Sequence, residues 1–201
     1  MNLTPAIRRL VLSLALGLML ATGLVAGCSG TSTPTAASDA SGAKQAVAVA
    51  MTTLSTAAPD PRLLVGQTAG AITATSVPVW QFLIGNPKTD MIYAVQVENG
   101  KGQWQPYGPA SLTATEWAAV PPLSAWKVDS GEAHDKAVAL HTSAKSAAYM
   151  LGFVTYIPAK SGPTSTPAMT WFVAFDPSAR GSDPTSTVNV DMGTGAASFA
   201  K

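Results

Sequence analysis

The chain carries a single cysteine, Cys28, directly after a segment with the three parts of an export signal. Arg8 and Arg9 form a basic start, residues 10–25 form an apolar run, and small residues fill the two positions before the cysteine. The apolar run is shorter than the roughly 20 residues that a helix needs to cross a bilayer. Because one cysteine cannot form an intramolecular disulfide, the exported domain must be stabilised by its core alone.

Residues 24–28, Leu-Val-Ala-Gly-Cys, resemble a bacterial lipobox. The resemblance implies that residues 1–27 are a signal peptide and that Cys28, carrying a diacylglycerol on its thiol, begins the mature protein. Two or three acyl chains would hold the protein firmly, because each buried CH₂ contributes about 0.8 kcal/mol. We expect a lipid-anchored, extracytoplasmic protein on the cell membrane or the outer membrane. The alternative is an uncleaved apolar anchor with a chance cysteine.

Residues 28–41 read as a tether, because they consist almost wholly of Ser, Thr, Ala, Gly and Pro and cannot bury a core. Residues 42–201 suffice for one domain or two small ones. Hydrophobic residues make up 47% of the chain and charged residues 11%, so this part should fold. The signal contains two of the 12 basic residues, which leaves near balance with the 11 acidic ones and no basic cluster. This composition argues against a nucleic-acid partner.

The pattern of apolar residues after residue 41 predicts helices followed by strands. Helices are expected over about 42–56 and from about residue 130, and a proline-rich connector over 109–125. Asn99-Gly100 predicts a hairpin turn, because both residues tolerate positive φ. The expected strand segments are 62–72, 77–84, 91–98 and 103–107 in the first half, and 149–157, 169–175 and 187–192 in the second.

The two halves look alike. WQFLI from Trp80 and VQVE ending at Glu98 parallel WFVAF from Trp171 and VNVD ending at Asp191. These matches predict an internal repeat, in which each half places a helix over the apolar face of an antiparallel sheet. The alternative is that any antiparallel α+β chain gives matches this short.

The second half resembles the PepSY family, small αβββ domains of bacterial envelope and secreted proteins. The matching segments are WKVDSGEA at 126–133 and VDMGTG at 190–195. The resemblance implies an α+β fold of two PepSY-like αβββ units, over 42–108 and 126–201, each a helix packed on an antiparallel sheet. It also implies inhibition or partner binding as the activity. The long loop at 161–167 departs from the compact form of the family.

No residue pattern points to a catalytic or metal site. His134 and His141 are seven residues apart, whereas helical zinc pairs are usually four apart, so we expect partly exposed helix histidines. Asp129, Glu132 and Asp135 cluster at a helix start, where stabilisation of the helix dipole explains them better than acid–base catalysis does. The chain has no Gly-x-Ser-x-Gly nucleophile motif.

The aromatic residues fall into two groups. Trp80 and Trp171 lie within apolar strand segments, so we expect both to be buried at comparable places in the two halves. The second group borders the connector, and its members either pack the connector onto the sheet, the favoured interpretation, or contact a ligand or partner. These residues are Trp104, Tyr107, Trp117 and Trp126.

These observations favour a non-catalytic binding or regulatory module for a protein or peptide of the cell envelope, without a cofactor. The alternatives are a carrier of a small apolar ligand and an enzyme with an unrecognised site. If the strand ending at Asp191 lies at a sheet edge, it could accept an extended peptide, and Asn189→Pro should weaken that capture.

Replacement of the lipobox cysteine tests the anchor. Cys28→Ala should abolish acyl labelling in cells and move the protein from the detergent phase to the aqueous phase on partitioning, because no thiol remains to carry lipid. Ser29→Ala is the matched control and should keep both properties. Unchanged labelling of Cys28→Ala would rule out this anchor.

Overall fold

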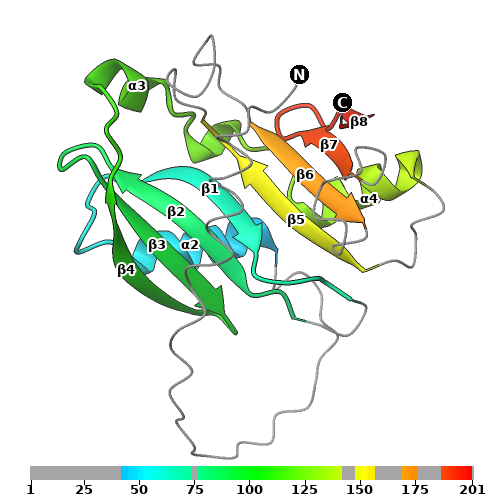
Figure 1. The fold of residues 1–201 in the computed structure, drawn as a ribbon, viewed down its shortest axis with the longest axis horizontal. Helices are drawn as coiled ribbons and strands as arrows, with labels where there is room; N and C mark the ends of the chain where they lie inside the picture. The colour runs from blue at the N-terminus through cyan, green and yellow to red at the C-terminus, as the bar shows by residue number, and fades with distance from the viewer. Residues whose placement is uncertain (1–41, 74–76, 142–147, 157–168, 176–186, 201) are drawn as a thin grey trace, which may run out of the picture.

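The computed structural model describes residues 42–73, 77–141, 148–156, 169–175 and 187–200. Its strands form one antiparallel sheet in the order β4-β3-β2-β1-β5-β6-β7-β8 (Figure 1). The strands are β1 (Arg62–Thr68), β2 (Trp80–Asn86), β3 (Met91–Glu98), β4 (Lys101–Pro109), β5 (Tyr149–Val154), β6 (Thr170–Phe175), β7 (Thr187–Asp191) and β8 (Ala197–Phe199).

Two eleven-residue helices, α2 (Ala43–Thr53) and α4 (Ser130–Leu140), lie behind the sheet in Figure 1 and so cover the same face. The connector contains α3 (Ala114–Ala119) and a short 3₁₀ helix, η1 (Leu123–Ala125). The helix starts and the Asn99-Gly100 hairpin are therefore confirmed, and the two turn residues have φ of 49° and 73°.

The predicted fold of two αβββ units, each with its own sheet, is wrong. Each half contributes four strands, and the two sets join through the antiparallel pairing of β1 with β5. Separate sheets would leave β1 and β5 with unpaired main-chain edges next to apolar side chains, a costly arrangement that the pairing removes. The sequence did not reveal this contact because β1 and β5 lie far apart along the chain.

Gly66 makes the junction of the halves possible. The paired residues are Val65 with Val154, Gly66 with Phe153 and Gln67 with Gly152. A Cβ at Gly66 would overlap the Phe153 ring and lie 2.8 Å from Phe82. The absent side chain therefore lets an aromatic ring cross the centre of the sheet.

The main core lies between the sheet and the two helices. As predicted, Trp80 and Trp171 are buried, with exposed fractions of 2% and 0%, and each lies in the second strand of its half. Their rings meet edge-on with centroids 6.3 Å apart. Trp126 is also buried, and the indole nitrogens of Trp126 and Trp171 both donate to the carbonyl oxygen of Val128, so neither buried N–H lacks a partner.

The connector packs against the opposite face of the sheet, which confirms the favoured interpretation for Trp117 but not for Trp104 and Tyr107, which are exposed. Trp117 of α3 is 5% exposed and lies over Gly85, where any Cβ would overlap the indole. Its indole nitrogen donates to Asp90 Oδ1 at 3.1 Å. The buried residues that join Trp117 in this smaller cluster are Leu64, Val65, Leu83, Val120, Val154 and Tyr156.

Side chains at the start of α4 bond to the first turn of α2. The N-cap of α2 is Gly42, which has no side chain to cap the helix. Ser130 Oγ accepts from the amide of Ala43 at 3.0 Å, and Asp129 Oδ1 accepts from the amides of Lys44 and Ser130 at 3.1 and 2.7 Å. Because both helix N-termini carry partial positive charge, the Asp129 carboxylate stabilises their approach.

Removal of this carboxylate should destabilise the fold. Asp129→Ala leaves two helix amides without their acceptor, and we expect a loss of about 1–2 kcal/mol in the free energy of unfolding, measured by urea denaturation. Glu132→Ala is the matched control, because it removes a carboxylate from the same turn whose ion pair with Lys136 is exposed. Equal losses for the two variants would contradict the shared cap.

Candidate functional site

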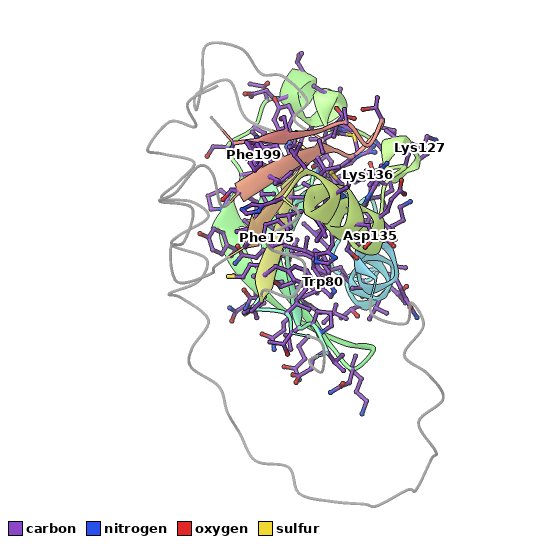
Figure 2. The ribbon with its side chains drawn as sticks, turned by 90° about the vertical axis from the view of Figure 1, so that its right-hand side faces the viewer. Trp80, Lys127, Asp135, Lys136, Phe175 and Phe199 are labelled. Carbon is purple, nitrogen blue, oxygen red and sulfur yellow. The ribbon has the colours of Figure 1, made fainter. Side chains whose placement is uncertain are left out.

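The two histidines are held apart by aromatic rings rather than gathered into a site. The His134 ring stacks on Tyr149 with centroids 4.0 Å apart, and His141 lies edge-on to Phe175 and Phe199 at 5.4 and 5.8 Å. Figure 2 shows Phe175 and Phe199 on the strands beside α4. Within the described residues, no group of three or more His, Cys, Asp or Glu side chains could hold a metal ion.

Burial shifts the pKa values of His134 and Tyr149. It lowers the pKa of His134 below 6.5, and the nearby Asp135 carboxylate, 3.6 Å from Nδ1, opposes that shift only in part. Burial also raises the pKa of Tyr149, with a further contribution from Asp135. Both directions favour the neutral rings near pH 7.

The predicted carboxylates have separate structural partners. Asp129 caps the two helices, Glu132 pairs with Lys136 at 3.4 Å, and Asp135 contacts His134. The Asp135 side chain is 85% exposed, so it does not face an enclosed site. Cys28, the predicted lipidation site, lies outside the described residues.

Asp191 shapes the turn after β7. Its Oδ1 atom accepts from the amides of Gly193 and Thr194 and from the Thr194 hydroxyl, at 2.9, 2.7 and 2.9 Å. Burial raises the pKa of Asp191, but these hydrogen bonds outweigh burial and lower it overall. The VDMGTG segment is thus a carboxylate-stabilised turn, and Gly195 completes it with φ of 75°.

The strand that ends at Asp191 is not an edge strand. β7 lies between β6 and β8, and Asn189 is paired with Phe172 on one side and with Ser198 on the other. β8 is only three residues long, which explains why the sequence pattern missed it. Asn189→Pro would therefore break pairing inside the sheet, and it does not test peptide capture.

The long free edge of the sheet is β4. This nine-residue strand has one neighbour, β3, among the described elements, and nearly all of its residues are exposed. Trp104 and Tyr107 are 43% and 48% exposed, and Trp104 packs edge-on against Tyr93 at 5.4 Å. Gly102 lies against Thr53 of α2, and a Cβ there would overlap the threonine hydroxyl. This edge places exposed aromatic surface beside main-chain groups, and we take it as the candidate site.

The hairpin determines which main-chain groups of β4 point outward. The residues flanking its two-residue turn, Glu98 and Lys101, form a hydrogen-bonded pair, and pairs then alternate along the strands. Lys101, Gln103 and Gln105 therefore bond to β3. The N–H and C=O groups of Gly102 and Trp104 point away from the sheet. Pro106 is the next residue that faces outward, but it has no N–H to donate. A partner strand can therefore pair fully with only a short part of β4.

A row of glutamines ends at this edge. Gln67, Gln81, Gln96 and Gln103 are direct neighbours on β1, β2, β3 and β4, on the face opposite the helices. Gln67 Nε2 donates to Gln81 Oε1 at 3.4 Å, whereas the amides of Gln96 and Gln103 have no hydrogen-bond partner within the described ranges. The row continues across the second half as Gly152, Phe172, Asn189 and Ser198.

Neither the β4 edge nor the glutamine row was predicted from the sequence. One signal was available, because Gln96 and Gln103 are equidistant from the Asn99-Gly100 turn and must therefore face each other.

No helix of the described part of the chain is long and apolar enough to cross a membrane. No family model, no curated protein and no solved structure matches the chain.

The lowered pKa of His134 predicts an acid-sensitive fold. Because His134 binds protons more weakly in the folded chain than in the unfolded chain, its contribution to stability is complete above pH 6.5 and falls as pH decreases below that value. The free energy of unfolding, measured at about pH 7.5 and about pH 5.5, should drop at the lower value. His134→Phe keeps a ring on Tyr149 and should reduce this drop. An unchanged pH dependence in His134→Phe would assign it to other groups.

Proposed function

We propose that the protein is a membrane-anchored envelope lipoprotein whose domain is a non-catalytic binding module, and that it captures an extended protein segment along β4. The observation that carries the proposal is a long edge strand that combines outward-facing main-chain groups with exposed aromatic side chains. Strand addition at such an edge obtains affinity from main-chain hydrogen bonds and specificity from alternate side chains.

The chemistry of β4 favours an uncharged segment with an apolar residue. Lys101 is the one charged residue of the strand, so long-range electrostatic attraction contributes little. The exposed indole of Trp104 is already held at an angle to Tyr93, so its burial by a partner costs little side-chain entropy. Because Pro106 lacks an N–H, the segment pairs fully only along the five residues from Lys101 to Gln105.

The other edge of the sheet is a poorer candidate. β8 spans Ala197–Phe199, so its three residues offer few groups for main-chain pairing. β4 pairs with β3 along most of its length and contacts α2 through Gly102, so its backbone is already ordered on one side before a partner binds. An ordered edge loses less conformational entropy on binding than a flexible one.

Photo-crosslinking in living cells tests capture at this edge. A photoreactive amino acid in place of the exposed Gln105 should form an adduct with another envelope protein. Trp104→Pro in the same chain should reduce that adduct about five-fold or more, because it removes an outward N–H and each lost hydrogen bond costs about 1 kcal/mol.

Two controls separate the edge from the rest of the surface. The photoreactive residue in place of Ala118, exposed on α3, should give no such adduct. Trp104→Ala keeps the N–H and should retain part of the adduct, whereas both variants should keep the circular dichroism of the wild type. An adduct that is equally strong at both positions, or insensitive to Trp104→Pro, would overturn capture along β4.

A further inference from the structure

The outward-facing groups of β4 are self-complementary. Between the hairpin turn and Pro106, the residues with outward N–H and C=O groups are Gly102 and Trp104, and Gln103 alone separates them. A second β4 turned by 180° about an axis through Gln103 would place each of these residues opposite the other. We propose that β4 pairs with β4 of a second copy of this chain about this axis, and that the pair is the resting state of the binding edge.

The main-chain pairing in this register is complete. Gly102 of each copy faces Trp104 of the other, and each such pair exchanges two N–H···O=C hydrogen bonds. All the outward N–H groups between the hairpin turn and Pro106 are therefore used. The exposed indole of Trp104 then lies beside Gly102 of the other copy, where Thr53 of α2 takes the space of the missing side chain and would contact the indole.

The side chains of the opposite face match in the same register. Gln103 faces Gln103 in a pair without main-chain hydrogen bonds, which is the closer of the two antiparallel spacings. The amide of Gln103 has no hydrogen-bond partner within the described residues, and a primary amide can donate and accept at once. The glutamine rows of the two copies would then form one continuous row. Lys101 faces Gln105, so no like charges oppose each other.

Pro106 sets the length and the strength of the pairing. It would lie opposite Gly100 of the hairpin turn, whose φ of 73° is not that of a strand, so pairing stops at this point. Five residues from each copy form an interface smaller than those of stable dimers. The dimer should therefore be weak in solution. Copies held on one membrane by tethers would reach a far higher effective concentration.

The pairing would regulate capture. The same N–H and C=O groups cannot serve a second copy and a foreign segment at once, so the two states compete. This consequence rests on the proposed function, whereas the pairing itself does not. Foreign segments would be captured where they displace the second copy, and sparse copies on a membrane would bind them more readily than crowded ones.

Cysteine trapping tests the register. The test uses the mature chain, residues 28–201, with Cys28→Ser so that an introduced cysteine is its sole thiol. Gln103→Cys would place the two thiols in the closer pair, where a disulfide can form between Cα atoms about 4.4–6.8 Å apart. Gln105→Cys, on the same strand and face, is the matched control, because its two copies would be separated by four residues, or about 14 Å, along the strands.

We expect the disulfide-linked dimer of Gln103→Cys to form about ten-fold faster than that of Gln105→Cys under mild oxidation, because only the former meets disulfide geometry. Trp104→Pro in the Gln103→Cys chain should lower the rate to that of the control, and Trp104→Ala, which keeps the N–H, should not lower it that far. Equal rates for the two cysteines, or no effect of Trp104→Pro, would overturn the self-pairing.

Different results would overturn the self-pairing and the proposed function. If Gln103→Cys traps no faster than its control while photo-crosslinking still captures another protein through β4, the second copy is excluded and the proposed function stands. If trapping succeeds and no foreign protein is crosslinked at Gln105 in sparse or crowded membranes, the edge serves self-association and the proposed function is wrong.

Discussion

The antiparallel pairing of β1 with β5 is the contact on which the rest of the structure depends. It joins the two halves into one sheet, buries what would otherwise be two edges and leaves β4 and β8 as the outer strands. Equivalent elements of the two halves are 87 residues apart. The helices α2 and α4 begin at residues 43 and 130, and the strands β1 and β5 begin at residues 62 and 149. Gly66 and Phe153 are paired at this same offset. The pairing also brings the two helix N-termini together, where the Asp129 carboxylate offsets their mutual repulsion.

Local signals in the sequence predicted local structure. The Asn99-Gly100 turn, the helix start after Asp129 and the burial of Trp80 and Trp171 each depend on a few neighbouring residues, and each is confirmed. The pairing of β1 with β5 depends on residues far apart along the chain, and no periodicity encodes it. The edge was misplaced for a related reason, since β8 has too few residues to produce a strand pattern. The pairing of Gln96 with Gln103 could have been predicted from the symmetry of the hairpin. The pairing of Gln67 with Gln81 could not, because it depends on the register of β1 with β2.

The two halves use equivalent positions differently. Val47 on α2 lies 87 residues before His134 on α4, and the C-caps of the two helices, Leu54 and His141, have the same offset. Aliphatic residues in one half therefore correspond to aromatic, titratable residues in the other. On the opposite face of the sheet, Trp117 of the connector packs with residues of β1, β2 and β5. β4 is supported separately, by its pairing with β3 and by the contact of Gly102 with Thr53 of α2.

The joint between the helices also determines how the domain bears force. Residue 42 immediately precedes α2, and the first amides of α2 are bonded to Ser130 and Asp129. Tension transmitted through the preceding chain would therefore enter at the helix pair, on the covered face, and not at a strand. Such tension would peel α2 from its neighbours before it sheared the hydrogen bonds between strands. A pull on residue 42 would then break the hydrogen bonds of Ser130 and Asp129 first, while the sheet kept its shape.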